Sequence, residues 1–334
     1  MDFSKFKNIL VFIEIADSKI SKISLEVLGA ANKIASKTNE EIIAVLIGKN
    51  IKNLTDEIIS FGANKVVTID SDEYDKFNLD IYTEVLQKIA EKYTPSTILL
   101  GATQNGKDLS GKLAVRLKTG SVTDAFNIDI DDKGNVIWTC AAYGGTVFTD
   151  MTIDNSRPQI GSLRSSAFKK IEQDTNKKGE VIAEDIKISI DSIKTKVIEI
   201  VKEISESVNL EEAEIIVTGG RGMGSAENYE LIKELAKLLG GVVGATRPVI
   251  EAGWVPRVHQ VGQSGKIVAP KLYIACGVSG AVQHTSGMSN SDYVVAINKD
   301  EDAPIFEVAD IGIVGNVLEA LPVMINEVKK LKES

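Results

Sequence analysis

The chain has 334 residues, of which 43% are hydrophobic, 25% are charged and 5% are aromatic, and its formal net charge is −9. This length is typical of two domains. The acidic balance argues against nucleic acid as a partner, and the scarcity of aromatic residues disfavours a stacking surface for single strands. No apolar run is long enough to span a bilayer, so we expect no membrane insertion.

The two cysteines, Cys140 and Cys276, stand far apart and lack the spacing of a metal site or of a disulfide framework. The apolar run at 9–13 is short and is followed by Glu14, which is not the pattern of a signal peptide. We therefore expect a cytoplasmic protein that binds no metal.

In the first half, short apolar runs alternate with stretches of helical periodicity. Strands are expected at 8–14, 42–47, 65–69 and 97–100, with helices at 25–35, 54–61 and 82–92. This alternation predicts a mostly parallel sheet with right-handed crossovers. Further β segments are expected at 128–131, 136–139 and 146–152, and a return to the sheet edge at 188–203. Their short polar turns predict an antiparallel extension of this sheet.

The loop Gly101–Asp108 follows a predicted strand and is rich in small and polar residues. It has two interpretations, a helix-capping turn or a nucleotide loop, because Lys107 is followed by Asp108 where a Walker motif has Ser or Thr. Capping is the simpler of the two.

The segment 205–212 is polar and acidic, which predicts a linker between a first domain at 1–204 and a second at 213–334. Such a segment also suits a hinge. In the second domain, strands are expected at 215–217, 242–245, 272–276, 293–297 and 311–314, with helices at 226–239 and 317–331. The fold class is thus α/β, with two doubly wound, Rossmann-like domains.

A glycine-rich turn follows the first of these strands. Gly220 and Gly222 fit the dinucleotide pattern Gly-x-Gly-x-x-Gly, whereas Ser225 takes the third place. Such a turn brings backbone N–H groups to a phosphate. The acidic residue expected after the second strand is replaced by Thr246 and Arg247, and an arginine there suits the 2′-phosphate of NADP. The turn alone therefore leaves two alternatives open, an NADP-dependent oxidoreductase and a nucleotide-binding regulatory module.

A combination of motifs resembles the α subunit of electron transfer flavoproteins over 215–331. These motifs are Gly253-Trp-Val-Pro256, Gln260–Lys266, Val268–Ala275, Gly277–His284 with Ser286-Gly-Met288, and Val295–Asp300 followed by Ala303-Pro-Ile-Phe306. Gly101–Asp108 and Tyr143-Gly-Gly extend the resemblance into the first half. It implies FAD in the second domain and a heterodimer in which the first domain packs on a β subunit. It also implies a carrier, more than an enzyme in its own right, that passes single electrons between an acyl-CoA dehydrogenase, or another flavin dehydrogenase, and an acceptor.

The resemblance also implies which residues contact FAD. Arg221 faces the phosphates, and Thr246 and Arg247 approach the isoalloxazine. The other expected contacts are the loop Val261, Gly262, Gln263 and Ser264, the loop Ser279, Gly280, Ala281, Val282, Gln283 and His284, and then Asn298, Asn316 and Val317. The hydroxyl of Ser264 is expected at flavin N5 and His284 at N1/O2, whereas Asn316 stands where the family often has an aspartate near the adenosine.

These residue types suit a carrier of single electrons, because added negative charge on a flavin is stabilised by a nearby cation or donor. Arg247 is planar and always charged, and His284 can donate a hydrogen bond. Taken alone, His284 is explained equally well as a structural hydrogen-bonding residue, and Arg247 as a surface ion-pair partner. Pro248 and Trp254 resemble members that bifurcate electrons with a second FAD in the β subunit.

Overall fold

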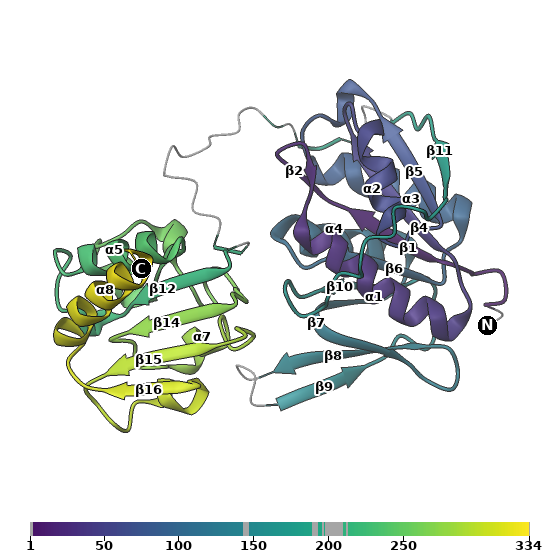
Figure 1. The fold of residues 1–334 in the computed structure, drawn as a ribbon. Coiled ribbons are helices and arrows are strands. Elements are labelled where there is room, and N and C mark those ends of the chain that lie inside the picture. The colour runs from purple at the N-terminus through teal and green to yellow at the C-terminus, as the bar shows by residue number, and fades with distance from the viewer. Residues whose placement is uncertain are drawn as a thin grey trace. The chain divides into compact units, whose positions relative to one another are not determined.

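The computed structural model describes residues 3–142, 147–188, 193–195, 197, 210–211 and 213–333. It contains two compact α/β units, each with its own sheet (Figure 1). The predicted fold class, including the antiparallel extension of the first sheet, is confirmed. The predicted linker 205–212 lies outside the described residues except for Leu210 and Glu211, and so does the motif Tyr143-Gly-Gly.

The first unit alternates strands and helices as far as α4. Its strands are β1 (Ile9–Ile13), β2 (Ile15–Ala16), β3 (Lys19–Ile20), β4 (Ile42–Gly48), β5 (Lys65–Asp70), β6 (Thr97–Gly101), β7 (Ser121–Ile130), β8 (Val136–Ala142), β9 (Val147–Met151), β10 (Gln159–Leu163) and β11 (Glu180–Ala183). Its helices are α1 (Lys22–Thr38), α2 (Thr55–Ser60), α3 (Leu79–Tyr93) and α4 (Gln104–Leu117). The loop before α4 is a capping turn, because the Thr103 hydroxyl accepts a hydrogen bond from the Gly106 N–H at 2.9 Å.

The main sheet of the first unit has the order β11-β5-β4-β1-β6-β10-β7-β8-β9. Its pairs are parallel except for β7–β8 and β8–β9. Residues of α1 and α2 pack on one face of this sheet, and residues of α3 and α4 pack on the other. Apolar residues of the central strands are buried on both faces, which explains their continuous apolar runs.

Strand β10 was not predicted, although it lies inside the sheet between β6 and β7 and is entirely buried. Its sequence, Gln159-Ile-Gly-Ser-Leu163, has only two large apolar residues. A Cβ atom on Gly161 would come within 2.2 Å of the Trp138 ring. The indole of β8 therefore fills the space that an apolar side chain of β10 would occupy, and the usual strand pattern is missing from the sequence.

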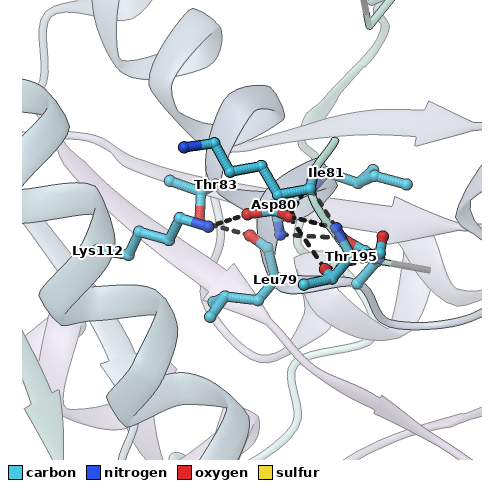
Figure 2. A network of polar contacts seen from close by, with 8 residues as sticks. Leu79, Asp80, Ile81, Thr83, Lys112 and Thr195 are labelled. Atoms are coloured by element: carbon cyan, nitrogen blue, oxygen red, sulfur yellow. Dashed lines mark hydrogen bonds and ion pairs between the residues drawn. The ribbon is translucent and has the colours of Figure 1, made fainter. Parts of the chain in front are cut away.

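A carboxylate on α3 holds the backbone of residues 194 and 195 in place within the first unit (Figure 2). Asp80 Oδ2 accepts hydrogen bonds from the Lys194 N–H at 2.9 Å, the Thr195 N–H at 3.1 Å and the Thr195 hydroxyl at 3.0 Å. Its other oxygen pairs with Lys112 of α4. The bond with Lys112 is the main reason why the pKa of Asp80 falls to about 2. The charged form of Asp80 thus ties three segments of the chain together.

The second unit has a parallel sheet in the order β13-β12-β14-β15-β16. Its elements are β12 (Ile215–Gly219), α5 (Tyr229–Leu239), β13 (Val242–Ala245), α6 (Arg247–Glu251), β14 (Leu272–Cys276), α7 (Val282–Thr285), β15 (Val294–Asn298), β16 (Ile311–Val314) and α8 (Val317–Glu333). Helices α5 and α8 cover one face. The opposite face is covered by residues outside the α-helices, among them Val268, Met288 and Ile305, the last of which lies in the 3₁₀ turn Pro304–Val308. Within the described part of the chain, no helix has both the length and the apolar character that a membrane crossing requires.

Candidate functional site

The second unit contains a pocket of about 850 Å³ at the carboxyl ends of β12, β13, β14 and β15. From β12 the chain crosses through α5 to β13 on one side, and it later returns to β14 on the other side. The loops after β12 and β14 therefore diverge, and the sheet has its topological switch point between these two strands. Parallel α/β sheets bind ligands at this position.

Two loops meet closely at the floor of this pocket. The Gly220 N–H donates to the Cys276 carbonyl at 2.9 Å, and the Gly222 N–H donates to the Gly277 carbonyl at 3.0 Å. A Cβ atom on Gly220 would lie 2.2 Å from the Gly277 oxygen. Only glycine allows the two loops to approach this closely. Loop packing therefore explains why glycines stand at these positions of the predicted phosphate-binding turn.

Helix α5 begins at Tyr229, three residues later than the sequence indicated. Side chains hold the intervening turn, because Asn228 Nδ2 donates to the Met223 carbonyl at 2.6 Å and the Asn228 N–H donates to the Ser225 hydroxyl at 3.4 Å. The glycine turn is therefore followed by a short 3₁₀ turn, Arg221–Met223, and not directly by the helix.

The loop from Val261 to Ser264 forms a second wall of the pocket. It is held by the bond from the Val261 N–H to the Ala245 carbonyl at 2.9 Å and by that from the Gln263 N–H to the Gln283 carbonyl at 2.7 Å. Gly262 has φ of +134°, and a Cβ there would lie 2.7 Å from the same Gln283 oxygen. This loop therefore has one backbone path, which fixes where the exposed Ser264 hydroxyl stands.

His284 is a buried part of the pocket wall, with 7% of its surface exposed. Its Nδ1 lies 3.0 Å from the Val261 carbonyl and its Nε2 lies 3.0 Å from the Tyr273 hydroxyl. Burial lowers the pKa of His284 to about 4, against the opposing effect of the Val261 carbonyl. The imidazole is thus neutral at pH 7, and both of its nitrogens are engaged within the protein.

The charged residues of the pocket are mostly cations. Arg221, Arg247 and Lys299 line it together with one carboxylate, Asp300. Arg247 Nε donates to Glu251 at 2.7 Å, but both side chains are more than half exposed, at 67% and 61%. Such an exposed pair contributes little, so Arg247 is free to exchange this partner for a ligand. The pocket suits an anionic ligand with several phosphate oxygens.

Most residues predicted to contact a cofactor lie around this one pocket. They are Arg221, Thr246, Arg247, Val261, Gly262, Gln263, Ser264, Ser279, Ala281, Gln283, His284 and Asn298. These residues lie at or after the carboxyl ends of four different strands, β12, β13, β14 and β15, so only the fold brings them together.

Four predicted residues are not part of the lining. Gly280 packs under the backbone of Ile305, because a Cβ there would lie 2.1 Å from the Ile305 nitrogen. The side chain of Val282 is exposed, and Val317, the first residue of α8, is buried in the core of the second unit. The Asn316 side chain accepts the Leu318 N–H at 3.1 Å at the start of α8.

Some lining residues were absent from the predicted set. Gln260 supports the loop, because its Nε2 donates to the Ser264 hydroxyl at 2.9 Å. Lys299 and Asp300 follow Asn298 at the end of β15. Their position directly after a predicted strand is the signal that would have identified them.

The first unit has a smaller hollow of about 400 Å³ at the carboxyl ends of β1 and β4. The carboxylates of Glu14, Asp17 and Asp75 line it beside one cation, Lys49, which pairs with Asp72 at 3.0 Å. This charge balance disfavours a phosphate, in contrast to the pocket of the second unit.

Comparisons with known proteins agree with this geometry. Residues 9–189 match the model of the electron transfer flavoprotein domain, and residues 209–289 match that of the electron transfer flavoprotein FAD-binding domain. The electron transfer flavoprotein subunit alpha of Thermoanaerobacterium thermosaccharolyticum is 46% identical over 98% of this chain and 99% of its own length. The corresponding protein of Megasphaera elsdenii is 43% identical over 99% of both chains. The acryloyl-CoA reductase electron transfer subunit beta of Anaerotignum propionicum is 36% identical over 100% of this chain and 98% of its own.

Proposed function

Because the chain belongs to the electron transfer flavoprotein α-subunit family, we propose that the pocket of its second unit holds the FAD of an electron carrier. The observation that supports this most strongly is the convergence of cationic, hydroxyl and glycine backbone groups at the switch point of the second sheet. The NADP-dependent oxidoreductase considered from the turn alone finds no support in these matches.

The residues present fit FAD. A volume of about 850 Å³ is within the range of cofactor pockets. Arg221 and the glycine turn supply positive charge and backbone donors for phosphates, and Thr246 and Ser264 supply hydroxyls. When bound, the flavin of FAD supplies the ability to take up and release electrons one at a time.

Two side chains set the charge around the flavin. We assign Arg247 to the isoalloxazine side, where its guanidinium stabilises added negative charge once it leaves the exposed carboxylate of Glu251. His284 needs an adjustment to the role implied by resemblance. Its nitrogens already contact Val261 and Tyr273, so it presents no free N–H to the pocket in the neutral state.

The partner of this chain in the proposal is an electron transfer flavoprotein β subunit, in a heterodimer. The domain at 1–204 is assigned to packing on that subunit, and the domain at 213–334 to FAD. The name of the Anaerotignum relative supports a dehydrogenase that acts on acyl-CoA thioesters as the electron donor or acceptor. Two buried free thiols, Cys140 and Cys276, suit a reducing cytoplasm.

The test is to coproduce the chain with its β subunit and to measure flavin by visible absorbance, and then its anaerobic reduction by an acyl-CoA with the matching dehydrogenase. We expect FAD in the complex and stepwise reduction. A complex that contains no flavin after reconstitution with FAD would contradict the proposal. The FAD count also tests bifurcation, which Pro248 and Trp254 favour by resemblance. Two FAD per heterodimer and oxidation of NADH are expected for a bifurcating complex, and one FAD for a simple carrier.

A further inference from the structure

A buried row of polar groups lies behind the pocket wall at His284. The Tyr273 hydroxyl is 3.0 Å from His284 Nε2, and Tyr273 is fully buried. Tyr273 lies on β14 opposite Ile216 of β12, and Thr218 is two residues farther along β12 on the same face. Thr218 is also fully buried. This row runs from the pocket wall into the sheet, and resemblance assigned a role only to its histidine.

The hydrogen-bond partners determine the tautomer of His284. A carbonyl oxygen only accepts, so the Nδ1 that faces Val261 must carry the proton. A neutral imidazole has a single N–H, and Nε2 is therefore an acceptor. The Tyr273 hydroxyl must then donate to it, and Tyr273 uses its only proton for this bond.

In this arrangement the Thr218 hydroxyl is the one polar group of the row without a hydrogen-bond partner. It has no partner of hydrogen-bond geometry among the described residues. It is nevertheless close enough to the Tyr273 phenol to oppose the rise in the phenol pKa that burial causes. Both side chains project from the same face of the sheet on adjacent strands, so the two hydroxyls are neighbours. A buried polar atom without a partner is costly and calls for an explanation.

A second arrangement of the same three side chains supplies that explanation. If His284 takes up a proton, Nε2–H donates to the Tyr273 oxygen, and the Tyr273 O–H turns to donate to the Thr218 oxygen. One proton passes from water to Nε2, and no covalent bond of Tyr273 or Thr218 breaks. The Nε2–H that protonation creates then has an acceptor in the Tyr273 oxygen, and the Tyr273 O–H has one in the Thr218 oxygen.

We propose that Tyr273 and Thr218 are positioning residues that let His284 change between a neutral and a protonated state inside the pocket wall. This proposal rests on the proposed function. In it, His284 takes up a proton and becomes a cation when the pocket gains negative charge. The other charged side chains that face the pocket are Arg221, Arg247, Lys299 and Asp300. Burial keeps the neutral form in the absence of such charge, and a nearby anion favours the protonated form.

The chain has only two histidines, which makes the proposal measurable by NMR of the complete complex with its β subunit and FAD. Histidine labelled with ¹⁵N in this chain alone gives a pair of ring-nitrogen signals for each of its two imidazoles, and the variant His259→Gln assigns them. His259, whose Nδ1 lies 2.8 Å from the Val243 carbonyl, is the internal reference. In the oxidised complex at pH 7 we expect His284 to be neutral with the proton on Nδ1. A proton on Nε2 in this state would overturn the proposal.

The same signals are then recorded after full reduction of the flavin with dithionite. We expect both nitrogens of His284 to carry protons in the wild type, while His259 stays unchanged. Thr218→Val preserves shape but removes the acceptor, so it should keep the oxidised-state tautomer and lower the protonation constant of His284 in the reduced complex about tenfold. Thr218→Ser should restore it. Tyr273→Phe should disturb the tautomer as well.

An unchanged protonation constant in Thr218→Val, within a factor of two, would overturn the relay. A reduced wild-type complex in which His284 stays neutral would do the same. Thr218→Ser retains the hydroxyl, so it separates loss of the relay from loss of packing. Failure of the proposed function is seen separately, as a complex without flavin absorbance, and the tautomer of His284 is measurable in that case too.

Discussion

Gly262 provides a quantitative test of how rigidly the pocket wall is built. Its φ of +134° is a region that side chains rarely adopt, and a Cβ would lie 2.7 Å from the Gln283 oxygen. Strain of this kind costs about 1–3 kcal/mol. The displaced oxygen also accepts the Gln263 N–H at 2.7 Å, and weakening that bond adds about 1 kcal/mol. We therefore expect Gly262→Ala to lower the free energy of unfolding by about 2–4 kcal/mol.

Two other glycines are matched controls for this substitution. Gly253 has φ of +72° with no described atom within 4 Å of a Cβ. Gly253→Ala therefore introduces the backbone strain but no steric contact, and it should lower the free energy of unfolding by about 1–2 kcal/mol. Gly111 lies in α4 with ordinary φ and equally open space, so Gly111→Ala should stabilise by about 0.5–1 kcal/mol. Urea unfolding of the full chain gives the three values.

Flavin retention is measured on the same variants. Gly262→Ala should lose FAD from the complex during gel filtration, while Gly111→Ala keeps it, because only the first moves the loop that carries Ser264. If Gly262→Ala proves as stable as Gly253→Ala and retains FAD fully, this loop does not pack closely on Gln283.

Asp80→Asn should lower the free energy of unfolding by about 2 kcal/mol at pH 7, because the fold holds the pKa of this carboxylate at about 2, below its ordinary 3.8. The stabilisation by the wild-type carboxylate is present above pH 4 and disappears as the pH falls towards 2. The urea midpoints of mutant and wild type should therefore converge near pH 2. The wild type should lose about 2 kcal/mol of its free energy of unfolding as the pH falls from 6.5 to 4.5, because the histidine of the unfolded chain takes up a proton before the buried His284 does. His284→Gln should not show this loss. Equal pH profiles of the two proteins would contradict the burial of a neutral ring. Arg247→Ala should change the free energy of unfolding by less than about 0.5 kcal/mol, because its ion pair is exposed, yet it should lower the potential of the first one-electron couple of the flavin. Arg247→Lys should have an intermediate potential and Glu251→Gln the wild-type one. A wild-type potential in Arg247→Ala would show that the arginine does not contact the flavin.

The regular parts of the fold were predictable because local pattern and burial agree there. Strands β13, β14 and β16 have the bounds expected from the sequence. Their apolar runs are short, and glycine or polar residues stop them at both ends. Strand β10 was missed because its core contribution comes from Trp138 on β8, which replaces a side chain at Gly161. The contact between Trp138 and Gly161 joins two strands that are distant in the sequence, so neither strand shows a local pattern that reveals it.

The candidate site was predictable to a similar extent. The motifs indicated the pocket-lining loops, because glycines and hydroxyls cluster within a few residues of strand ends. The role of Tyr273 was not foreseen, since a tyrosine inside an apolar strand looks like any core residue. Its contact with His284 joins β14 to α7, 11 residues farther along the chain, and only the tertiary structure shows that Thr218 lies behind it.

Labelling with a photoreactive FAD analogue tests whether the pocket of the second unit holds FAD. The complex of the full chain with its β subunit is reconstituted with an azide-bearing FAD, irradiated, and digested for peptide mapping. We predict covalent attachment to this chain at peptides within 220–304, which contain the lining residues, and loss of labelling when excess FAD is added. Attachment of the analogue to peptides within 9–188, with none in 220–304, would show that the pocket of the second unit does not hold FAD.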